Sequence, residues 1–320
     1  MNTKIVTNYY MDCEGYPYHG TSGSRKPRYW GGLVYQCKAF NPIPFICYTH
    51  ERNLLELENL KTKYNLENLE IKIRELNEMK LHSQISKVIG GKFIPEIAGR
   101  GLEIMWGKFD LLERENNNIE KIYWTDIGLT HAGIFPWRFN SKFNKIEQHI
   151  PLPYPPIISF ENLEQYDFSS IMNLALIEKI NALTSKKILF LISLNPQISY
   201  DIFLQKEIVS FLKPYHFPIA GFFGGDSLIL KEFINLFWEI SNKVLEKEIL
   251  TTEEAVIKIC VDIFDEEKTL NTFFDCHYDH SSDITYNHFT QWEKDSNKLK
   301  PLYTVWQDII SLCAKKNSNY

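Results

Sequence analysis

The first 73 residues alternate short apolar segments with amphipathic ones, and this alternation constrains the fold more than any other feature of the chain. Residues 4–10, 44–49 and 69–73 have the length and apolar content of buried strands. Residues 33–40 and 51–64, which lie between them, have the apolar spacing of helices. Strands and helices that alternate at this short spacing predict a parallel sheet covered by helices.

The rest of the chain continues this pattern. Its length of 320 residues suffices for one large α/β domain. We expect a mostly parallel central sheet flanked by helices over residues 1–265, with residues 266–320 as a C-terminal extension that packs on the same domain. Further strands are expected at 122–128, 188–192 and 218–225, further helices at 79–87, 101–114, 202–212, 227–248 and from 252 onward, and irregular structure at 132–156.

Residues 121–131 form the most informative segment. Ile122, Tyr123 and Trp124 predict a buried strand, Asp126 follows at its end, and Gly128 comes two residues later. Ligand sites of open α/β sheets lie just outside the carboxyl ends of strands, and a glycine lets a ligand approach the backbone. Asp126 is therefore the first candidate for an active-site acid, although an acid in this position also serves as a turn or helix cap.

Charge and cysteine usage exclude several classes of function. The formal net charge is −5 and no long basic block occurs, so we expect no nucleic acid as partner. The six cysteines show no paired spacing, which argues against a thiolate zinc site and suits a reducing compartment. No apolar run reaches the roughly 18 residues of a membrane span. We expect a cytoplasmic location, with peripheral association at the inner membrane left open.

Residues 11–32 hold five glycines together with Arg25, Lys26 and Arg28. A glycine-rich loop with several cations can wrap a diphosphate. The segment lacks the spacing of a Walker A or dinucleotide-binding motif, and a solvent-exposed surface loop explains its composition equally well.

Three anchors appear in a defined order along the chain. They are the strand at 5–10 followed by Arg28, the run Trp124-Thr125-Asp126-Ile127-Gly128, and the glycine pair Gly224-Gly225 with two acids behind it at 253–254. In this order and spacing, residues 4–265 resemble the HtrL/YibB-like group of bacterial surface-polysaccharide proteins. That group resembles the GT-A class of nucleotide-sugar glycosyltransferases.

The resemblance implies a glycosyltransferase that moves a sugar from a nucleotide donor, most simply a UDP-sugar, to a glycan acceptor of the bacterial surface. Glu253 or Glu254 would be the catalytic base and Asp126 a further catalytic acid. The residues implied at the donor are Thr7, Asn8, Tyr9, Arg25, Arg28, Trp124, Thr125, Gly128, Gly224 and Gly225.

The resemblance also implies a divalent metal, Mn²⁺ or Mg²⁺, on the donor diphosphate. Such enzymes hold it with a DxD motif, but Gly128 stands here in place of the second acid. Asp126 would then ligate the metal alone or contact the ribose and sugar directly. His277 and His280, in the polar C-terminal segment, are the candidates for additional ligands, and a solvated tail is the alternative.

Two other functions remain open from the sequence. The chain could be a different nucleotide-using enzyme, which would turn over a nucleoside triphosphate. It could also be a sugar-binding module that keeps the fold without the chemistry, an alternative to which the missing second acid gives weight. Substitution of Asp126 separates a catalyst from a binding module.

Overall fold

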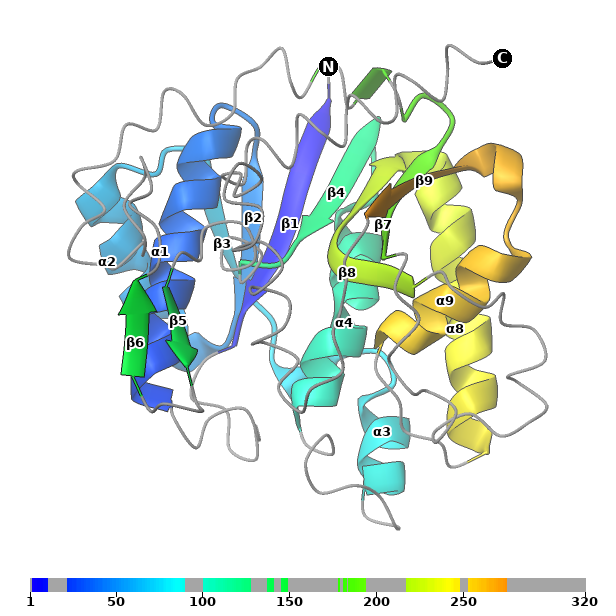
Figure 1. The fold of residues 1–320 in the computed structure, drawn as a ribbon, viewed down its shortest axis with the longest axis horizontal. Helices are drawn as coiled ribbons and strands as arrows, with labels where there is room; N and C mark the ends of the chain where they lie inside the picture. Colours follow the sequence, from blue (N-terminus) through cyan, green and yellow to red (C-terminus); the bar gives the residue numbers. More distant parts are fainter. Residues whose placement is uncertain are drawn as a thin grey trace.

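The computed structural model describes residues 2–10, 22–89, 100–127, 137–140, 145–148, 178, 181–182, 184–193, 217–247 and 253–274. Within these ranges, strands and helices alternate through most of the chain (Figure 1). In chain order the elements are β1 (Thr3–Tyr9), α1 (Ser22–Phe40), β2 (Phe45–Thr49), α2 (Glu51–Tyr64), β3 (Leu69–Ile73), η2 (Leu76–Glu78), α3 (His82–Ile89), α4 (Arg100–Glu115), β4 (Lys121–Thr125), β5 (Trp137–Asn140), β6 (Lys145–Gln148), β7 (Ile188–Ser193), β8 (Phe217–Asp226), α8 (Ser227–Glu246), α9 (Glu253–Ile263), η7 (Glu266–Lys268) and β9 (Thr269–Phe274).

The central sheet has seven strands in the order β3-β2-β1-β4-β8-β7-β9. The pairs β3-β2, β2-β1, β1-β4 and β7-β9 are parallel, whereas β8 runs antiparallel to both β4 and β7. After β1 the chain moves outward to β2 and β3, and it then returns to the other side of β1 as β4. The strand order therefore reverses between β1 and β4, and this is the position at which open α/β sheets bind ligands.

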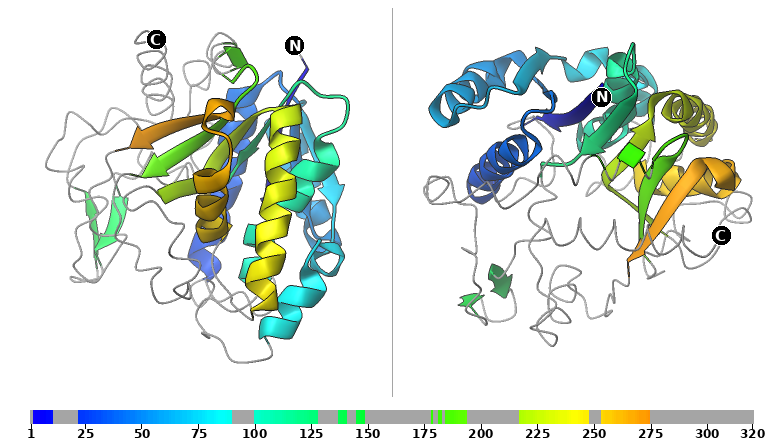
Figure 2. Two further views of the ribbon diagram at one scale, coloured as in Figure 1. Left: turned by 90° about the vertical axis from the view of Figure 1, so that its right-hand side faces the viewer. Right: turned by 90° about the horizontal axis from the view of Figure 1, so that it is seen from above.

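The core fills the face of the sheet on which α4 and α8 lie side by side (Figure 2). Alternation along the strands decides which residues reach this face, so Val6 of β1 and Trp124 of β4 point to it and both are fully buried. Phe109 of α4 lies at its centre, with its ring stacked on Phe237 at 3.7 Å and on Phe223 at 5.2 Å. Helices α1 and α2 meet over the other face, where Tyr9 of β1 points.

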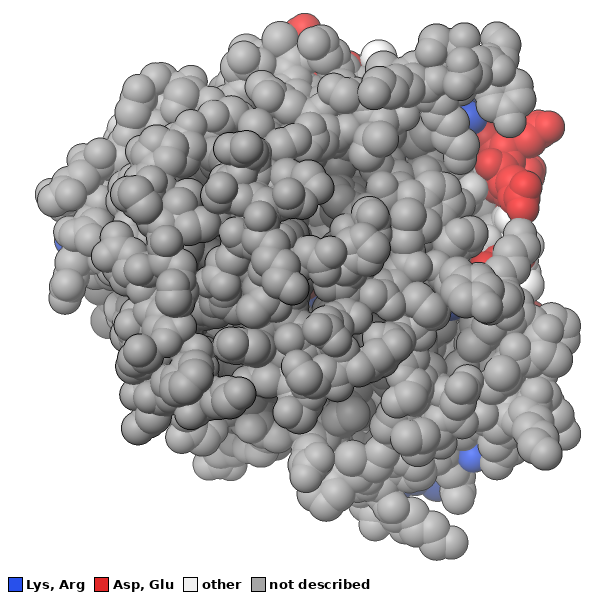
Figure 3. Space-filling model, in the orientation of Figure 1, with Lys and Arg blue, Asp and Glu red and all other residues white. Residues whose placement is uncertain are grey.

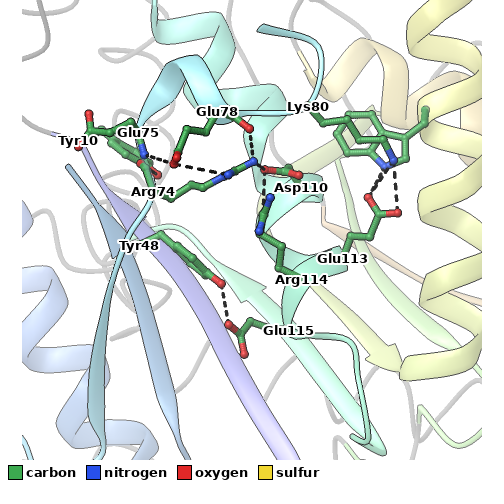
Figure 4. Close-up of polar contacts among 11 residues, drawn as sticks. Tyr10, Tyr48, Arg74, Glu75, Glu78, Lys80, Asp110, Glu113, Arg114 and Glu115 are labelled. Carbon is green, nitrogen blue, oxygen red and sulfur yellow. Dashed lines mark hydrogen bonds and ion pairs between the residues drawn. The ribbon is translucent and has the colours of Figure 1, made fainter. Parts of the chain in front are cut away.

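Polar contacts fix α4 against its neighbours (Figure 4). Arg74, just after β3, pairs with Asp110 at 3.2 Å. Glu113 accepts from the Trp238 indole at 2.9 Å, and Glu115 accepts from the Tyr48 hydroxyl at 2.6 Å. These bonds come from β2, from the segment after β3 and from α8, so they fix both the position and the rotation of α4. Every side chain that α4 presents to the sheet is thereby held in place.

Most elements agree with the sequence. The predicted fold class, an α/β domain with a mostly parallel central sheet flanked by helices, is confirmed. Two local predictions are wrong. Residues 22–32, predicted as part of a glycine-rich loop, are helical and form the first turns of α1, and the segment predicted as irregular contains the antiparallel pair of β5 and β6. β9, at the start of the predicted C-terminal extension, is an edge strand of the central sheet.

Acidic side chains of the described residues gather at the right-hand edge of the view in Figure 3, over η7 and the end of α9. Asp265, Glu266 and Glu267 are exposed there. Lys268 pairs with Glu232 of α8 at 2.7 Å and so balances part of this charge. No helix in the described ranges has the length and hydropathy needed to cross a membrane.

Candidate active site

Asp126 lies directly after β4 at the carboxyl edge of the sheet, the lower edge in Figure 1. Alternation along the strand turns its side chain to the α4 face, as for Trp124 two residues earlier. Its backbone is held on both sides, because its N–H donates to the Gly221 carbonyl at 2.7 Å and its carbonyl accepts from the Gln36 amide at 2.9 Å. The indole of Trp124 donates to Oδ1 of Asp126 at 2.8 Å. The strand end therefore presents one oriented carboxylate.

A second acid reaches the same place from a distant part of the chain. Nζ of Lys108, on α4, donates to Oδ2 of Asp126 at 3.0 Å and to Oε1 of Glu253 at 2.7 Å. Glu253 begins α9, where acids suit the helix dipole. The Lys108 and Glu253 side chains are about 5% and 4% exposed, whereas 35% of the Asp126 side chain is exposed. Two acids 127 positions apart thus share one buried cation, and one of them faces outward.

The charges in this cluster influence one another strongly. Burial alone would lower the pKa of Lys108, but the carboxylates of Asp126 and Glu253 outweigh burial and raise it above its usual value. Burial raises the pKa of Asp126, and Glu253 adds to this effect while Lys108 and the Trp124 indole oppose it. Oε2 of Glu253 is buried and has no hydrogen-bond partner among the residues that the structure describes. The cluster therefore combines a permanently charged ammonium with one unused carboxylate oxygen.

The described residues do not fit a divalent metal ion. Both oxygens of Asp126 and one oxygen of Glu253 already accept hydrogen bonds, and the point where the two acids converge is taken by the ammonium of Lys108. Within the described ranges, no three acidic, histidine or cysteine side chains gather as a metal site would require. His277 and His280 lie outside the described residues, so their proposed part in holding Mn²⁺ or Mg²⁺ stays a prediction.

The end of β1 lies beside Asp126, because β1 and β4 are neighbouring parallel strands. Val6 pairs with Trp124, and continuing this register by two residues places Asn8 next to Asp126. Asn8 is partly exposed on the α4 face, where its amide approaches the Ile104 carbonyl at 3.5 Å. Of the implied donor residues on β1, Asn8 is the one whose side chain can reach a ligand at this edge.

Four of the other residues implied at the nucleotide-sugar donor are buried. Thr7, Tyr9, Trp124 and Thr125 are each at most 1% exposed. The Tyr9 hydroxyl donates to Glu56 of α2 at 2.6 Å, and the Thr125 hydroxyl donates to the side chain of Gln36 at 2.7 Å. Tyr9, Trp124 and Thr125 bond to neighbouring side chains and hold the strand ends that carry Asn8 and Asp126, whereas the Thr7 hydroxyl has no hydrogen-bond partner among the described residues.

The resemblance implies that the glycine pair lies beside the nucleotide-sugar donor, but the structure places it elsewhere. Gly224 and Gly225 lie inside β8, paired with Tyr123 and Ile122 near the start of β4, which is the opposite end from Asp126. Both have a positive φ, of 137° and 147°, and an added Cβ on Gly224 would lie 2.3 Å from the Ile122 carbonyl oxygen. These glycines are required by the close approach of strands within the sheet.

The other residues implied at the donor or as catalytic base are Arg25, Arg28, Gly128 and Glu254. Arg25 and Arg28 lie on the first turns of α1, where the structure describes the backbone alone. Gly128 lies outside the described residues. Glu254 is partly buried and lies about a quarter of a helical turn from Glu253, away from the contact with Lys108.

Sequence patterns missed two residues of the site, Lys108 and Gln36. Lys108 had a detectable signal, because it lies four residues after Ile104 and three before Leu111, on the apolar stripe of α4. A lysine on a buried stripe is rare unless it is paired. Gln36 is 1% exposed and bonds to both Thr125 and Asp126, but a single glutamine in a helix has no pattern that predicts such a role.

Comparisons with known proteins add distant likenesses. No protein-family model matches the sequence, and no curated protein matches it. The apo crystal structure of mouse xyloside xylosyltransferase 1 is similar over 95% of this chain and 94% of its own, at 7% identity and a TM-score of 0.44. The 4-diphosphocytidyl-2C-methyl-D-erythritol synthase of Anaerococcus prevotii is similar over 92% of this chain and 97% of its own, at 10% identity and a TM-score of 0.35. At these scores the fold rests on the sheet topology and the site on its own geometry.

Proposed function

We propose that the chain is a glycosyltransferase that takes a sugar from a nucleotide donor, most simply a UDP-sugar, and transfers it to a glycan acceptor of the bacterial surface. One observation carries the proposal. Two acids from distant parts of the chain, Asp126 and Glu253, meet on Lys108 at the carboxyl edge, beside the point where the strand order reverses. Ligands of open α/β sheets bind there. The glycan acceptor is suggested by the resemblance to HtrL/YibB-like proteins alone.

The two acids have different surroundings, which suits different tasks. Asp126 is partly exposed and oriented, so it can accept hydrogen bonds from donor hydroxyls. Glu253 is buried, with Oε2 unpartnered among the described residues. In an inverting transfer, Glu253 would take the proton of the acceptor hydroxyl while the acceptor oxygen bonds to the anomeric carbon and the bond to the nucleoside diphosphate breaks. Asn8, from β1, lies where it can contribute a contact to the donor.

Binding of nucleotides tests the proposal. Calorimetry with UDP, GDP and CDP should detect binding of at least one of them to the wild-type chain. Asp126→Asn should weaken it by about tenfold, the effect of one charged hydrogen bond. Glu239→Gln, at an exposed position on α8 where the acid pairs with Lys243 of the same helix, is the matched control and should bind like wild type. Failure of all three nucleotides to bind would refute the proposal.

A sugar-binding module without catalysis is the second candidate. It is favoured by the salt bridge between Lys108 and Glu253, because the ammonium at 2.7 Å holds one oxygen of the carboxylate that would have to take the proton. Such a module would bind the nucleotide sugar but release no nucleoside diphosphate with any glycan acceptor. Release of the diphosphate that is lost in Glu253→Gln, with binding retained, would decide for the transferase.

A further inference from the structure

The centre of the candidate site is a positive charge that the chain itself supplies. We propose that the Lys108 ammonium is the permanent cation of this site and positions Asp126, so that the nucleotide sugar binds without a divalent metal ion. This inference rests on the function proposed above, because it concerns how the same site holds its donor. It assigns to Lys108 a positioning role that sequence motifs do not indicate.

Packing makes this cation a fixed part of the site. Ile104 and Leu111, one turn before and after Lys108 on α4, are buried, and the ring of Trp124 lies 5.8 Å from Nζ. The ion pair of Asp110 with Arg74 and the hydrogen bonds that Glu113 and Glu115 accept hold the rest of α4 against the sheet and α8. The ammonium therefore cannot swing out into solvent without moving the helix. Its raised pKa keeps it charged over the whole physiological range.

The same contacts disfavour a metal at Asp126. A divalent ion on Oδ2 would lie against the Lys108 ammonium, and repulsion between like charges is strong in a buried site. A carboxylate offers about four acceptor positions, and Trp124 and Lys108 occupy one on each oxygen of Asp126. The open positions on this partly exposed carboxylate remain available to hydroxyl groups, either of the ribose or of the transferred sugar.

The charge of the donor diphosphate then has to be met by fixed cations elsewhere at this edge. Gln36 of α1 lies beside Thr125 and Asp126 at the end of β4. A helix rises about 1.5 Å per residue, so Arg28 lies roughly 12 Å nearer the start of α1. The first turns of α1 carry Arg25 and Arg28 and no acid. Cations on a helix start can neutralise a diphosphate without a metal.

Calorimetry of the full chain with UDP, once after dialysis against EDTA and once with Mn²⁺, tests the inference. We expect dissociation constants that agree within about threefold. Binding that requires Mn²⁺, or that weakens more than about tenfold in EDTA, would overturn the inference and leave the proposed function standing. Failure of UDP, GDP and CDP alike to bind, with or without Mn²⁺, refutes the function itself. Titrations with 2′-deoxy-UDP and with a UDP-sugar show whether ribose or sugar hydroxyls supply the contact.

A second experiment uses the metal alone and needs no nucleotide. Lys108→Met keeps most of the length of the side chain but removes the charge, which leaves Asp126 and Glu253 facing each other. Mn²⁺ should then raise the melting temperature of this variant and not that of wild type or of Lys108→Arg, which keeps the cation. Stabilisation of the wild type by Mn²⁺ that disappears in Asp126→Asn would show that a metal, and not Lys108, is the cation at this acid.

Discussion

Replacement of Lys108 by methionine should lower the stability of the fold strongly at neutral pH and only slightly in mild acid. Methionine fills most of the same volume, so the change removes a charge more than it opens a cavity. Glu253 would then be a buried carboxylate without its cation, and loss of one partner of a buried ion pair costs about 3–5 kcal/mol. Asp126 should add less than about 1 kcal/mol, because its side chain is 35% exposed and solvent screens it.

Protonation of Glu253 limits this cost and gives it a pH dependence. A carboxyl that must stay neutral in the folded state costs about 1.4 kcal/mol for each pH unit above its unfolded pKa of about 4.3. The penalty is therefore limited to about 1 kcal/mol at pH 5 and about 5 kcal/mol at pH 8. The sign follows from linkage, because a carboxyl whose folded pKa is raised loses stability as pH rises from its unfolded pKa to its folded pKa.

Urea denaturation of wild type and Lys108→Met at pH 5 and pH 8 measures these differences. We expect the deficit to grow by roughly 2–4 kcal/mol between the two pH values. The double variant Lys108→Met with Glu253→Gln removes the buried acid as well, and it should recover most of the loss at pH 8. A deficit below about 1 kcal/mol at pH 8, or one that is equal at both pH values, would refute the assignment of a buried ion pair.

Four further substitutions test the fold that supports the site. Gly224→Ala should lower the free energy of unfolding in urea by several kcal/mol, because its Cβ would lie 2.3 Å from the Ile122 oxygen at a φ of 137°. Gly107→Ala is the control. Its Cβ would meet a flexible methionine at 3.2 Å, so the free energy of unfolding should change by less than about 1 kcal/mol. Phe109→Ala should cost about 3–5 kcal/mol, since the ring lies at the centre of the core. For Glu115, burial alone would raise the pKa, but hydrogen bonds from Lys72, Tyr48 and Lys4 on three strands outweigh burial and lower it below its usual value. Glu115→Gln should therefore be less stable than wild type at pH 7, and this difference should shrink as the pH falls through the lowered pKa.

The order of most strands and helices could be predicted because β2, β4 and β7 are largely apolar, β3 alternates between apolar and charged residues, and the helices have apolar stripes. The start of α1 could not. Its glycines lower the helix propensity of residues 22–32, but later turns of the same helix bury Leu33, Val34 and Cys37 completely. Packing of those turns decides the helix as a unit, and tertiary contacts of this kind are not visible in a local window. The reversed direction of β8 is invisible for the same reason.

The site was predictable in part. Local sequence shows which residues carry reactive side chains, but only tertiary contacts decide where those side chains lie. Asp126 follows an apolar strand and Glu253 opens a helix, so both could be proposed from sequence neighbours alone. Gly224 and Gly225 show the limit of this approach. A glycine pair after a strand has the same local pattern whether it approaches a ligand or another strand, and β8 needs both glycines for the second purpose.

Lys108 shows one more inference that the sequence allows and one that it does not. An ammonium on the buried stripe of α4 must have an acidic partner, so its position alone predicts a buried ion pair. The chain holds 40 acidic residues, and nothing local identifies the two that Lys108 meets. The acids of the site say more about the lysine than the lysine says about the acids. Gly128 removes one acid from the expected metal site, and a site with fewer acids needs less positive charge to balance it. A single lysine, placed by α4 between Asp126 and Glu253, is a cation suited to that smaller charge.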